Sequence, residues 1–490
     1  MNPIAIPFFA LAAIAYSGVS LAGGGSLTPP PGVPGKTMRS LDEIEPRIPL
    51  VDGSTGVTVA PAGNITITQM GSYFLAGDLA VTGGDAITIA ANGVTVDLRG
   101  FTISSSAGDS EGAAILVNAS QVRVLNGHVA SGTSYNEGAM GDQFTGPGFD
   151  YGVNVGIDDV TGIHVRDLSI VGCDIGGIRC DFMGDIFDRD QSSVVERCSV
   201  RTAGQLGILA HLVTDSTVRE CGGTGIDALS AHGCRGESVD GVGISSNSVS
   251  ASYGSGTTYG IHSSGWVSNS YAFLTGEPSL GAAILGWRVD GCRAFANHSR
   301  GILGSYVTNS SAFLASGSYA IDATLVSNCR AYTSESGGGI DALCVSNSSG
   351  VTEGSQSGIR ASNVDGCIGI SASGDGIRFF ASANDIDGSA VRNSYGRSDS
   401  EFNSGDGIAT DGIVTGCYGY SQKGDGIRAR VVAHSYGQSA GDDGIQADIV
   451  SYSTGNRSGG AAGEVAIEAE IALACHATGP TDIDNKYIMP

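Results

Sequence analysis

Two segments of the sequence carry closely spaced aspartates, a residue type that binds metal ions through carboxylate oxygens. Residues 181–191 read D-F-M-G-D-I-F-D-R-D-Q, and residues 130–152 mix further acids with aromatic residues. Because hard oxygen ligands suit Ca²⁺, the candidate calcium ligands are Asp142, Asp150, Asp181, Asp185, Asp188 and Asp190. The competing interpretation, which we favour, is a solvated acidic loop that binds no metal.

Two arginines accompany these acids and are the candidate catalytic residues. Arg179 and Arg189 lie in or beside the second acidic segment, and a guanidinium could neutralise a substrate carboxylate or act as a base. The eight histidines share no spacing that indicates a metal site. No C-x-x-C pair indicates zinc.

Aromatic residues form a further stripe in the second half of the chain. They follow a small residue by one or three positions, at Tyr271, Phe295, Phe313, Tyr332, Tyr418 and Tyr436. Such a stripe could stack on sugar rings, or it could form a packing ladder between repeats. We favour the packing ladder.

A repeated motif indicates the elements that must position these residues. Val, any residue, Asn or Gly, then Cys or Ser recurs along the chain, as in V-S-N-C-R-A-Y at 326–332. A small residue followed by Ile recurs with it, on average about every 20 residues, a spacing typical of repeat arrays. The segments are rich in Val, Ile, Ser, Thr and Gly with short alternation, which predicts short strands and tight turns. Coils of three strands would stack into a parallel β-solenoid.

The motif predicts one sharp corner in each coil. Asn and Gly adopt positive φ most readily, so one such residue can turn the chain in a single step. The predicted corner residues are Asn269, Gly291, Asn309, Asn328, Asn347, Gly366, Asn393 and Gly416. The Cys or Ser that follows each of them should be buried at a crowded position.

The corner column also bears on the eleven cysteines. Cys and Ser mostly alternate in the column, which would place successive cysteines roughly 10 Å apart, beyond disulfide reach. We therefore predict free buried thiols at Cys292, Cys329, Cys367, Cys417 and Cys475. Four earlier cysteines fall on consecutive coils, and there we predict one disulfide, either Cys173–Cys198 or Cys221–Cys234.

Charge and the leading residues restrict the partners and the location. The net charge of −24, from 49 acidic and 25 basic residues, argues against nucleic acid and anionic lipid. Residues 1–22 carry no charged side chain and end in S-L-A, so we expect an export signal and an extracellular, cell-surface or periplasmic protein. The alternative is an uncleaved membrane anchor; no later stretch could span a bilayer.

The chain divides into a few regions by composition. We expect a Pro/Gly linker and lead-in over residues 23–64, a β-helix over 65–475 and a C-terminal tail over 476–490. Insertions are predicted near 130–152, 181–191 and 397–405. Because a solenoid must protect its open edge, we expect residues 65–82 to act as an N-terminal cap.

These features resemble the right-handed parallel β-helix proteins of the pectate-lyase-like superfamily. The resemblance rests on the coil period, the V-x-[N/G]-[C/S] corners and the repeated G-D-G-I at 374–377, 405–408 and 424–427. The passages T-M-R-S-L-D-E-I-E-P-R-I-P-L and D-N-K-Y-I-M-P are similar to a group of mostly uncharacterised exported bacterial β-helix proteins. The resemblance implies a single-stranded right-handed β-helix of about 18–20 residues per coil.

The resemblance also implies activities to look for, since function lives in sites and not in the coil. Lyases of the superfamily use Ca²⁺ with an Arg or Lys base, whereas hydrolases use aspartates in an N-T-D, D-D, G-H-G, R-x-K series. The chain has no G-H-G, and R-A-R at 428–430 lacks the lysine. The expected function is therefore structural, adhesive or carbohydrate-binding, and the alternative is a Ca²⁺-dependent lyase or epimerase acting on an acidic glycan.

Overall fold

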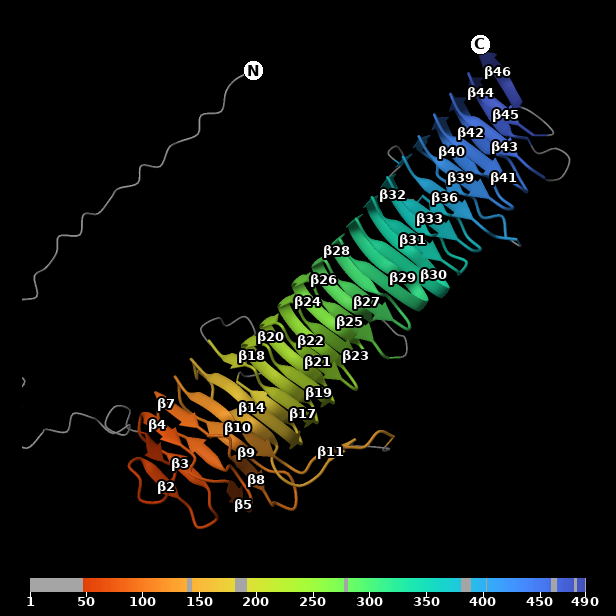
Figure 1. Cartoon of the computed structure of the whole chain (residues 1–490). Coiled ribbons are helices and arrows are strands. Elements are labelled where there is room, and N and C mark those ends of the chain that lie inside the picture. Colours follow the sequence, from red (N-terminus) through yellow and green to blue (C-terminus); the bar gives the residue numbers. More distant parts are fainter. Residues whose placement is uncertain are drawn as a thin grey trace, which may run out of the picture. The chain divides into compact units, whose positions relative to one another are not determined.

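The computed structural model shows an all-β solenoid built from parallel strands. It describes residues 47–138, 143–180, 192–276, 281–379, 389–401, 403–459, 465–479 and 483–489. Forty-four strands join in one network that makes about 20 turns, and the described residues contain no helix. Figure 1 shows the coils following one another from β2 to β46. The predicted fold class is confirmed, whereas the expected signal and most of the lead-in lie outside the described residues.

The first coils place separate strands in three rows. The first row holds β3 (Ile65–Ile67), β6 (Ile87–Ile89), β9 (Ala113–Val117), β13 (Tyr151–Val155) and β15 (Gly176–Arg179). The second row holds β4 (Gly71–Phe74), β7 (Val94–Asp97) and β16 (Val194–Glu196), and the third row holds β5 (Leu79–Val81), β8 (Thr102–Ser105) and β17 (Ser199–Ala203). Two strands run through the second and third rows, β10 (Arg123–Ala130) and β14 (His164–Cys173). A short antiparallel hairpin projects from the first insertion, β11 (Ser134–Tyr135) with β12 (Phe144–Thr145).

In most later coils one bent strand covers the first and second rows. These strands are β18 (Leu206–Thr214), β20 (Thr224–His232), β22 (Val242–Ser250), β24 (Tyr259–Ser268), β26 (Ala282–Asp290), β28 (Ile302–Thr308), β32 (Ile359–Asp365), β40 (Ile427–Ala433), β42 (Ile445–Ser451), β44 (Ile467–Leu473) and β46 (Ile483–Met489). Two coils keep separate strands, β34 (Ile377–Arg378) with β35 (Ala390–Arg392), and β37 (Ile408–Ala409) with β38 (Ile413–Thr415). Two long strands cover all three rows, β29 (Ser311–Ser327) and β30 (Arg330–Ser346).

The third row of the later coils consists of short strands after the corner. They are β19 (Thr217–Cys221), β21 (Arg235–Ser238), β23 (Tyr253–Gly256), β25 (Tyr271–Leu274), β27 (Arg293–Ala296), β31 (Ser349–Thr352), β33 (Ile368–Ser371), β36 (Tyr395–Ser398), β39 (Tyr418–Ser421), β41 (Tyr436–Ser439), β43 (Thr454–Arg457) and β45 (His476–Thr478). In the four-residue strands of this row the second and fourth residues point into the coil, and the first and third point outward. This alternation follows from the two-residue period of a strand.

The core is a file of isoleucines stacked in register. Each Ile of the small-Ile repeat pairs with the corresponding Ile of the next coil, from Ile208 to Ile467, and every one is fully buried. Each coil therefore buries its inner side chains against its two neighbours, as expected for a solenoid.

The predicted corners are confirmed. All eight corner residues have positive φ, between 47° at Asn347 and 64° at Gly291, Gly366 and Gly416. The backbone N–H of the residue after a corner donates to the serine Oγ of the next coil. Between Cys329 and Ser348 this bond is 3.0 Å long, and Ser348 Oγ in turn donates to the carbonyl of Ser346 at 2.7 Å. Serine in this column thus satisfies two backbone groups that would otherwise be buried without partners.

The predicted disulfide is wrong, because all eleven cysteines are free thiols. Cys173 and Cys221 share one column, but Ala203 of the intervening coil lies between them. Cys198 belongs to the corner column, as does Cys234, and Ser216 lies between those two. Neither predicted pair therefore shares a column, and within each column one coil separates the two thiols. Burial raises the pKa of Cys173 to about 12, which is expected for an inert structural thiol.

The N-terminal cap lies upstream of the predicted segment. The strands within residues 65–82 already pair in parallel with the following coil, so they form the first complete coil. Its outer edge is covered by β1 (Ile48–Pro49), parallel to β4, and by β2 (Val57–Val59), antiparallel to β3. An antiparallel partner ends the stack because it breaks the repeating register. In the described residues, no helix is long and apolar enough to cross a membrane.

Candidate functional site

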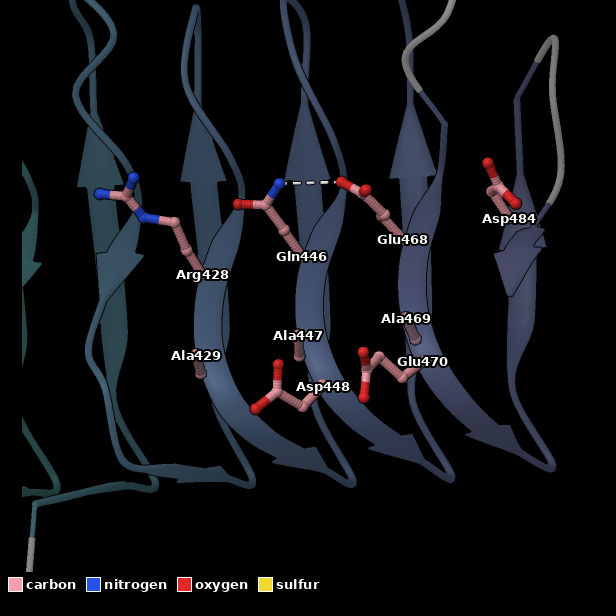
Figure 2. Close-up of a pocket in the computed structure, with 9 residues that line it drawn as sticks. All are labelled: Arg428, Ala429, Gln446, Ala447, Asp448, Glu468, Ala469, Glu470 and Asp484. Atoms are coloured by element: carbon pink, nitrogen blue, oxygen red, sulfur yellow. Dashed lines mark hydrogen bonds between the residues drawn. The ribbon is translucent and has the colours of Figure 1, made fainter. Parts of the chain in front are cut away.

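The last coils form a groove with a floor of small side chains. Ala429, Ala447 and Ala469 lie in register on β40, β42 and β44, where each strand bends between the first and second rows. Residues on either side of each alanine point outward, because alternate residues of a strand share one face. Figure 2 shows the alanines between two lines of longer, polar side chains. We call this feature the C-terminal groove.

The C-terminal groove consists of two adjoining hollows of opposite charge. The acidic hollow has a volume of about 470 Å³, and its charged lining includes Asp448, Glu468, Glu470 and Asp484. The basic hollow has a volume of about 630 Å³, and its charged lining includes Arg378, Arg428, Arg430, Asp411 and Asp448. Both hollows share Arg428, Ala429 and Asp448. The groove is therefore continuous and crosses successive coils.

One line of side chains along the groove follows the strand register. Arg428 of β40 pairs with Gln446 of β42, which pairs with Glu468 of β44 and then with Asp484 of β46. Gln446 Nε2 donates to Glu468 Oε2 at 2.8 Å (Figure 2). The charge thus changes from positive to negative across three neighbouring coils, with an amide at the boundary.

A column of aspartates, buried except for the half-buried Asp375, lies beside Arg378 and Arg428 in the turns that precede the first-row strands. These are the aspartates of G-D-G-I at Asp375, Asp406 and Asp425, followed by Asp443. One carboxylate oxygen of each accepts the backbone N–H of the next coil's residue, at 2.8 Å from Asp406 to Asp375, 2.9 Å from Asp425 to Asp406 and 3.2 Å from Asp443 to Asp425. The column continues with the N–H of Val465, which donates to Asp443 at 2.7 Å.

Burial raises the pKa of all four carboxyl groups. It raises the pKa of Asp406 to about 7, although the Arg428 guanidinium lowers it. Burial together with the Asp406, Asp442 and Asp443 carboxylates raises the pKa of Asp425 to about 8. Burial also raises the pKa of Asp443 to about 7 and that of Asp375 by a smaller amount. Removing a carboxylate from water disfavours its charged form.

Two arginines of the basic hollow reach back to this column. Arg428 Nη2 lies 2.7 Å from Asp406 Oδ2, and the arginine side chain is 55% exposed whereas the aspartate side chain is 3% exposed. Although the distance is short, no donor N–H is directed at Oδ2, so the contact is an ion pair without a hydrogen bond. Arg378 Nε lies farther, 3.7 Å, from Asp375 Oδ2. The buried column and the surface groove are thereby connected.

Three carboxylates of this region lie close enough together to raise the question of a metal ion. Asp425, Asp442 and Asp443 bring one oxygen each within 4.8 Å of one another. Ca²⁺ takes about six to eight oxygen ligands, and Asp425 and Asp443 already accept backbone N–H groups. We therefore interpret the group as neighbouring carboxyls that raise one another's pKa.

Of the candidate site residues predicted from the sequence, the structure describes Asp150 and Arg179. Arg179 Nε donates to Asn154 Oδ1 at 2.8 Å, and its guanidinium lies over the Tyr151 ring. Burial raises the pKa of Asp150. The other candidates lie outside the described residues, namely Asp142, Asp181, Asp185, Asp188, Arg189 and Asp190. The proposed calcium site and the catalytic arginines remain predictions.

The aromatic stripe forms stacked ladders on the outer side of the third row. Phe295 and Phe313 have ring centroids 4.4 Å apart with planes inclined by 20°, and Phe313 and Tyr332 have centroids 5.4 Å apart. Tyr418 stacks between Tyr395 and Tyr436 at 5.2 and 5.1 Å. Because a ring within a ladder has both faces covered by its neighbours, it offers no free face to a sugar. This geometry favours the packing interpretation.

The C-terminal groove itself was not predicted from the sequence. Its signal was present in R-A-R at 428–430 and in the G-D-G-I repeats. From the sequence, R-A-R indicates only an incomplete hydrolase motif, and G-D-G-I indicates only the coil repeat. Their proximity depends on the strand register, which places Arg428 one coil after Asp406.

Comparisons with known proteins give a similarity in fold at low identity. No protein-family model and no curated protein matches the chain. Among solved structures, the A-module of the mannuronan C-5 epimerase AlgE6 from Azotobacter vinelandii is 13% identical, with a TM-score of 0.22 over 85% of this chain and 91% of that one. The A-module of AlgE4 from the same organism is also 13% identical, with a TM-score of 0.23 over 86% and 91%. At these values, the comparisons contribute nothing to the argument about the site.

Proposed function

We propose that this protein is an exported, non-catalytic β-helix that binds a linear acidic glycan in the basic hollow of the C-terminal groove. The observation that supports the proposal is the convergence of Arg378, Arg428 and Arg430 in one open hollow on a chain whose net charge is −24. The three arginines outnumber Asp411 and Asp448 in the lining of this hollow, so the lining carries a small positive charge that favours anions on an otherwise acidic protein.

The shape and chemistry of the groove fit a uronate chain. A guanidinium presents paired N–H groups to a carboxylate, which makes arginine well suited to recognise carboxylates. The coils repeat every ~4.8 Å, so a chain lying over the basic hollow would meet Arg378 and Arg428 at the same register position two coils apart. The alanine floor leaves room for sugar rings between the two lines of polar side chains.

The direct test is calorimetric titration with oligogalacturonate and with a neutral glucan oligosaccharide of the same length. We expect the acidic oligosaccharide to bind and the neutral one not to bind. The double variant Arg428→Ala/Arg430→Ala should weaken binding roughly tenfold or more, since each lost charge-assisted contact costs more than 1 kcal/mol. The matched control is Arg293→Ala/Arg330→Ala, which removes two exposed arginines from the third row. Equal binding of both sugars, or equal losses in both variants, would contradict the proposal.

A second candidate function is a lyase or an epimerase that acts on the same glycan. It is favoured by the presence of Asp411 and Asp448 beside the arginines of the basic hollow, since such enzymes need a group that neutralises the uronate and a group that moves a proton. Incubation with polyuronate distinguishes the candidates. A lyase gives an unsaturated product that absorbs ultraviolet light, and an epimerase changes the anomeric proton signals of the polymer.

Export is part of the proposal and rests on the sequence of residues 1–22 alone. The expected result is a secreted or surface-exposed chain whose N-terminal sequence starts after Ala22. Recovery of the protein from the cytosol with an intact N-terminus would contradict it.

A further inference from the structure

We propose that Asp406 controls the C-terminal groove: its ionised carboxylate holds the Arg428 guanidinium, and its protonated form releases Arg428 to bind a carboxylate of the glycan. Binding of an acidic glycan would then strengthen as the pH falls from about 8 to about 6, on either side of the Asp406 transition. This inference rests on the proposed function, because it concerns the regulation of the same groove.

The geometry separates the two oxygens of Asp406. Oδ1 accepts the N–H of Asp425 at 2.9 Å, a bond that a neutral carboxyl can also accept. Oδ2 faces Arg428 Nη2 at 2.7 Å and has no aligned hydrogen-bond donor. Protonation of Asp406 therefore changes the contact with Arg428 and leaves the backbone column intact.

The groups around Asp406 keep its ionisation near neutral pH. The charged and titratable groups that influence it are Arg428 on β40, Asp375 in the turn of the preceding coil, and Asp425 and Asp442 in the turns of the following coils. Arg428 and the backbone N–H of Asp425 favour the carboxylate, whereas burial and the Asp375 and Asp442 carboxylates oppose it. Because Asp375 and Asp425 are themselves buried and titrate at raised pKa values, lowering the pH also removes the repulsion that they exert.

The exposure of the two partners lets a ligand compete with Asp406. The arginine side chain is 55% exposed, so its guanidinium is accessible to a glycan carboxylate from the hollow. A carboxylate bound at Arg428 would reduce the stabilisation of ionised Asp406. By linkage, glycan binding must then favour proton uptake by Asp406 to the same extent that the proton favours glycan binding.

The experiment is calorimetric titration of the full chain with oligogalacturonate at pH 6 and pH 8. For the wild type we expect several-fold tighter binding at pH 6. Repeating the titration at pH 7.5 in two buffers of different ionisation enthalpy should reveal uptake of a fraction of one proton. Asp406→Asn retains an oxygen for the Asp425 N–H and imitates the neutral carboxyl, so it should bind tightly at both pH values without proton uptake. The matched control is Asp341→Asn, which unpairs Arg360 on an earlier coil and should retain the wild-type pH dependence.

The outcomes separate the inference from the proposed function. Glycan binding that is independent of pH, or a pH dependence that persists in Asp406→Asn, would overturn the inference and leave the proposed function standing. If no acidic glycan binds at any pH, the proposed function fails. The switch itself is then judged from the NMR signal of the Arg428 Nε–H group. A transition near neutral pH in the wild type that is missing in Asp406→Asn supports the switch, and its absence from both proteins overturns it.

Discussion

Two corners of the same coil solve the same problem with different side chains. At the V-x-[N/G] corner, a buried serine oxygen accepts the N–H of the preceding coil, as Ser348 does for Cys329. At the G-D-G-I turn, a buried aspartate oxygen accepts the N–H of the following coil, as Asp406 does for Asp425. Both devices satisfy backbone groups that the stack removes from water.

The two corners differ because the aspartate side chain has a second oxygen and the serine side chain does not. Serine has no second oxygen, and its hydroxyl proton goes to a carbonyl two residues earlier, so the corner is neutral and fully satisfied. The aspartate keeps a second oxygen that is buried and charged when ionised, and Arg428 is the cation that faces it at Asp406. The serine corner thus stabilises the stack independently of pH. The aspartate turn also stabilises the stack, but its contribution depends on pH, and its second oxygen contacts the exposed Arg428. The following predictions test this contrast, from the largest expected effect to the smallest.

The largest effect should come from neutralising the most perturbed carboxyl. Asp425 has a native pKa of about 8, compared with about 3.9 in an unfolded chain. Between these values the native state holds a proton that the unfolded state has lost, so stability falls as the pH rises from about 4 to about 8. Asp425→Asn keeps the acceptor for the Asp443 N–H and should raise the free energy of unfolding at pH 8 by on the order of 3 kcal/mol. At pH 4 the two proteins should be similar.

Denaturant unfolding followed by circular dichroism at the two pH values measures this difference. Asp240→Asn, at an exposed position, should change little at either pH. If Asp425→Asn destabilises the protein at pH 8, the carboxyl is held as an anion, and the contrast between the two corners is wrong.

A smaller effect is expected at the neutral corner. Ser348→Ala leaves the N–H of Cys329 and the carbonyl of Ser346 without their hydroxyl partner, which should cost about 1–3 kcal/mol. Unlike the effect at Asp425, this loss should be the same at pH 5 and pH 8. Ser349→Ala, whose side chain points outward from β31, is the matched control. A loss that varied with pH would remove the distinction between the corners.

The aromatic ladder should contribute less, and only to stability. Phe313→Ala removes stacking on Phe295 and Tyr332, each contact being worth about 0.5–1.5 kcal/mol. Because the rings of the ladder are partly exposed, only part of this stacking energy should be lost. We therefore expect the free energy of unfolding to fall by about 1 kcal/mol. Glycan binding in the C-terminal groove should be unchanged; weaker binding would show that the ladder itself contacts the sugar.

The smallest effect should follow the addition of a reducing agent, which we expect to leave the melting temperature unchanged. Burial raises the pKa of Cys198 and Cys221 to about 12, so these thiols should resist alkylation until the protein unfolds. Counting alkylated cysteines before and after denaturation checks this expectation. A reducible crosslink in the native protein would show that the two thiol columns lie closer together than the structure places them.

The architecture could be predicted because its signals are local and repeated. Asn328 turns the chain through its own backbone preference, and the same residue types recur coil after coil with the same spacing. The disulfide prediction failed because it used the number of coils between cysteines but not the column to which each belongs. Cys173 lies at the end of the third-row strand, whereas Cys198 lies at the corner, and only the register distinguishes them.

The groove could not be predicted for a related reason. Arg428 and Asp406 are 22 positions apart in the sequence, and three connections between strands lie between them. Their contact requires the aspartate to be buried in a turn and the arginine to extend backward over it from the next strand. The raised pKa of Asp406 results from this burial, and the motif G-D-G-I alone does not indicate that its aspartate is buried.

The in-register pairing has a consequence for how the length of such a chain can change. Ser311 of one coil lies directly against Arg330 of the next, and after a local shift at Ser316 the same pairing resumes at Tyr319. Excision of residues 311–329 would therefore join two positions that are already equivalent, and every column would close over the gap. Loss of a single residue would instead turn the buried file toward solvent along the affected strand. Molecules of this kind are thus expected to grow and shrink during evolution by whole windings, while the chemistry carried on the terminal windings is inherited intact.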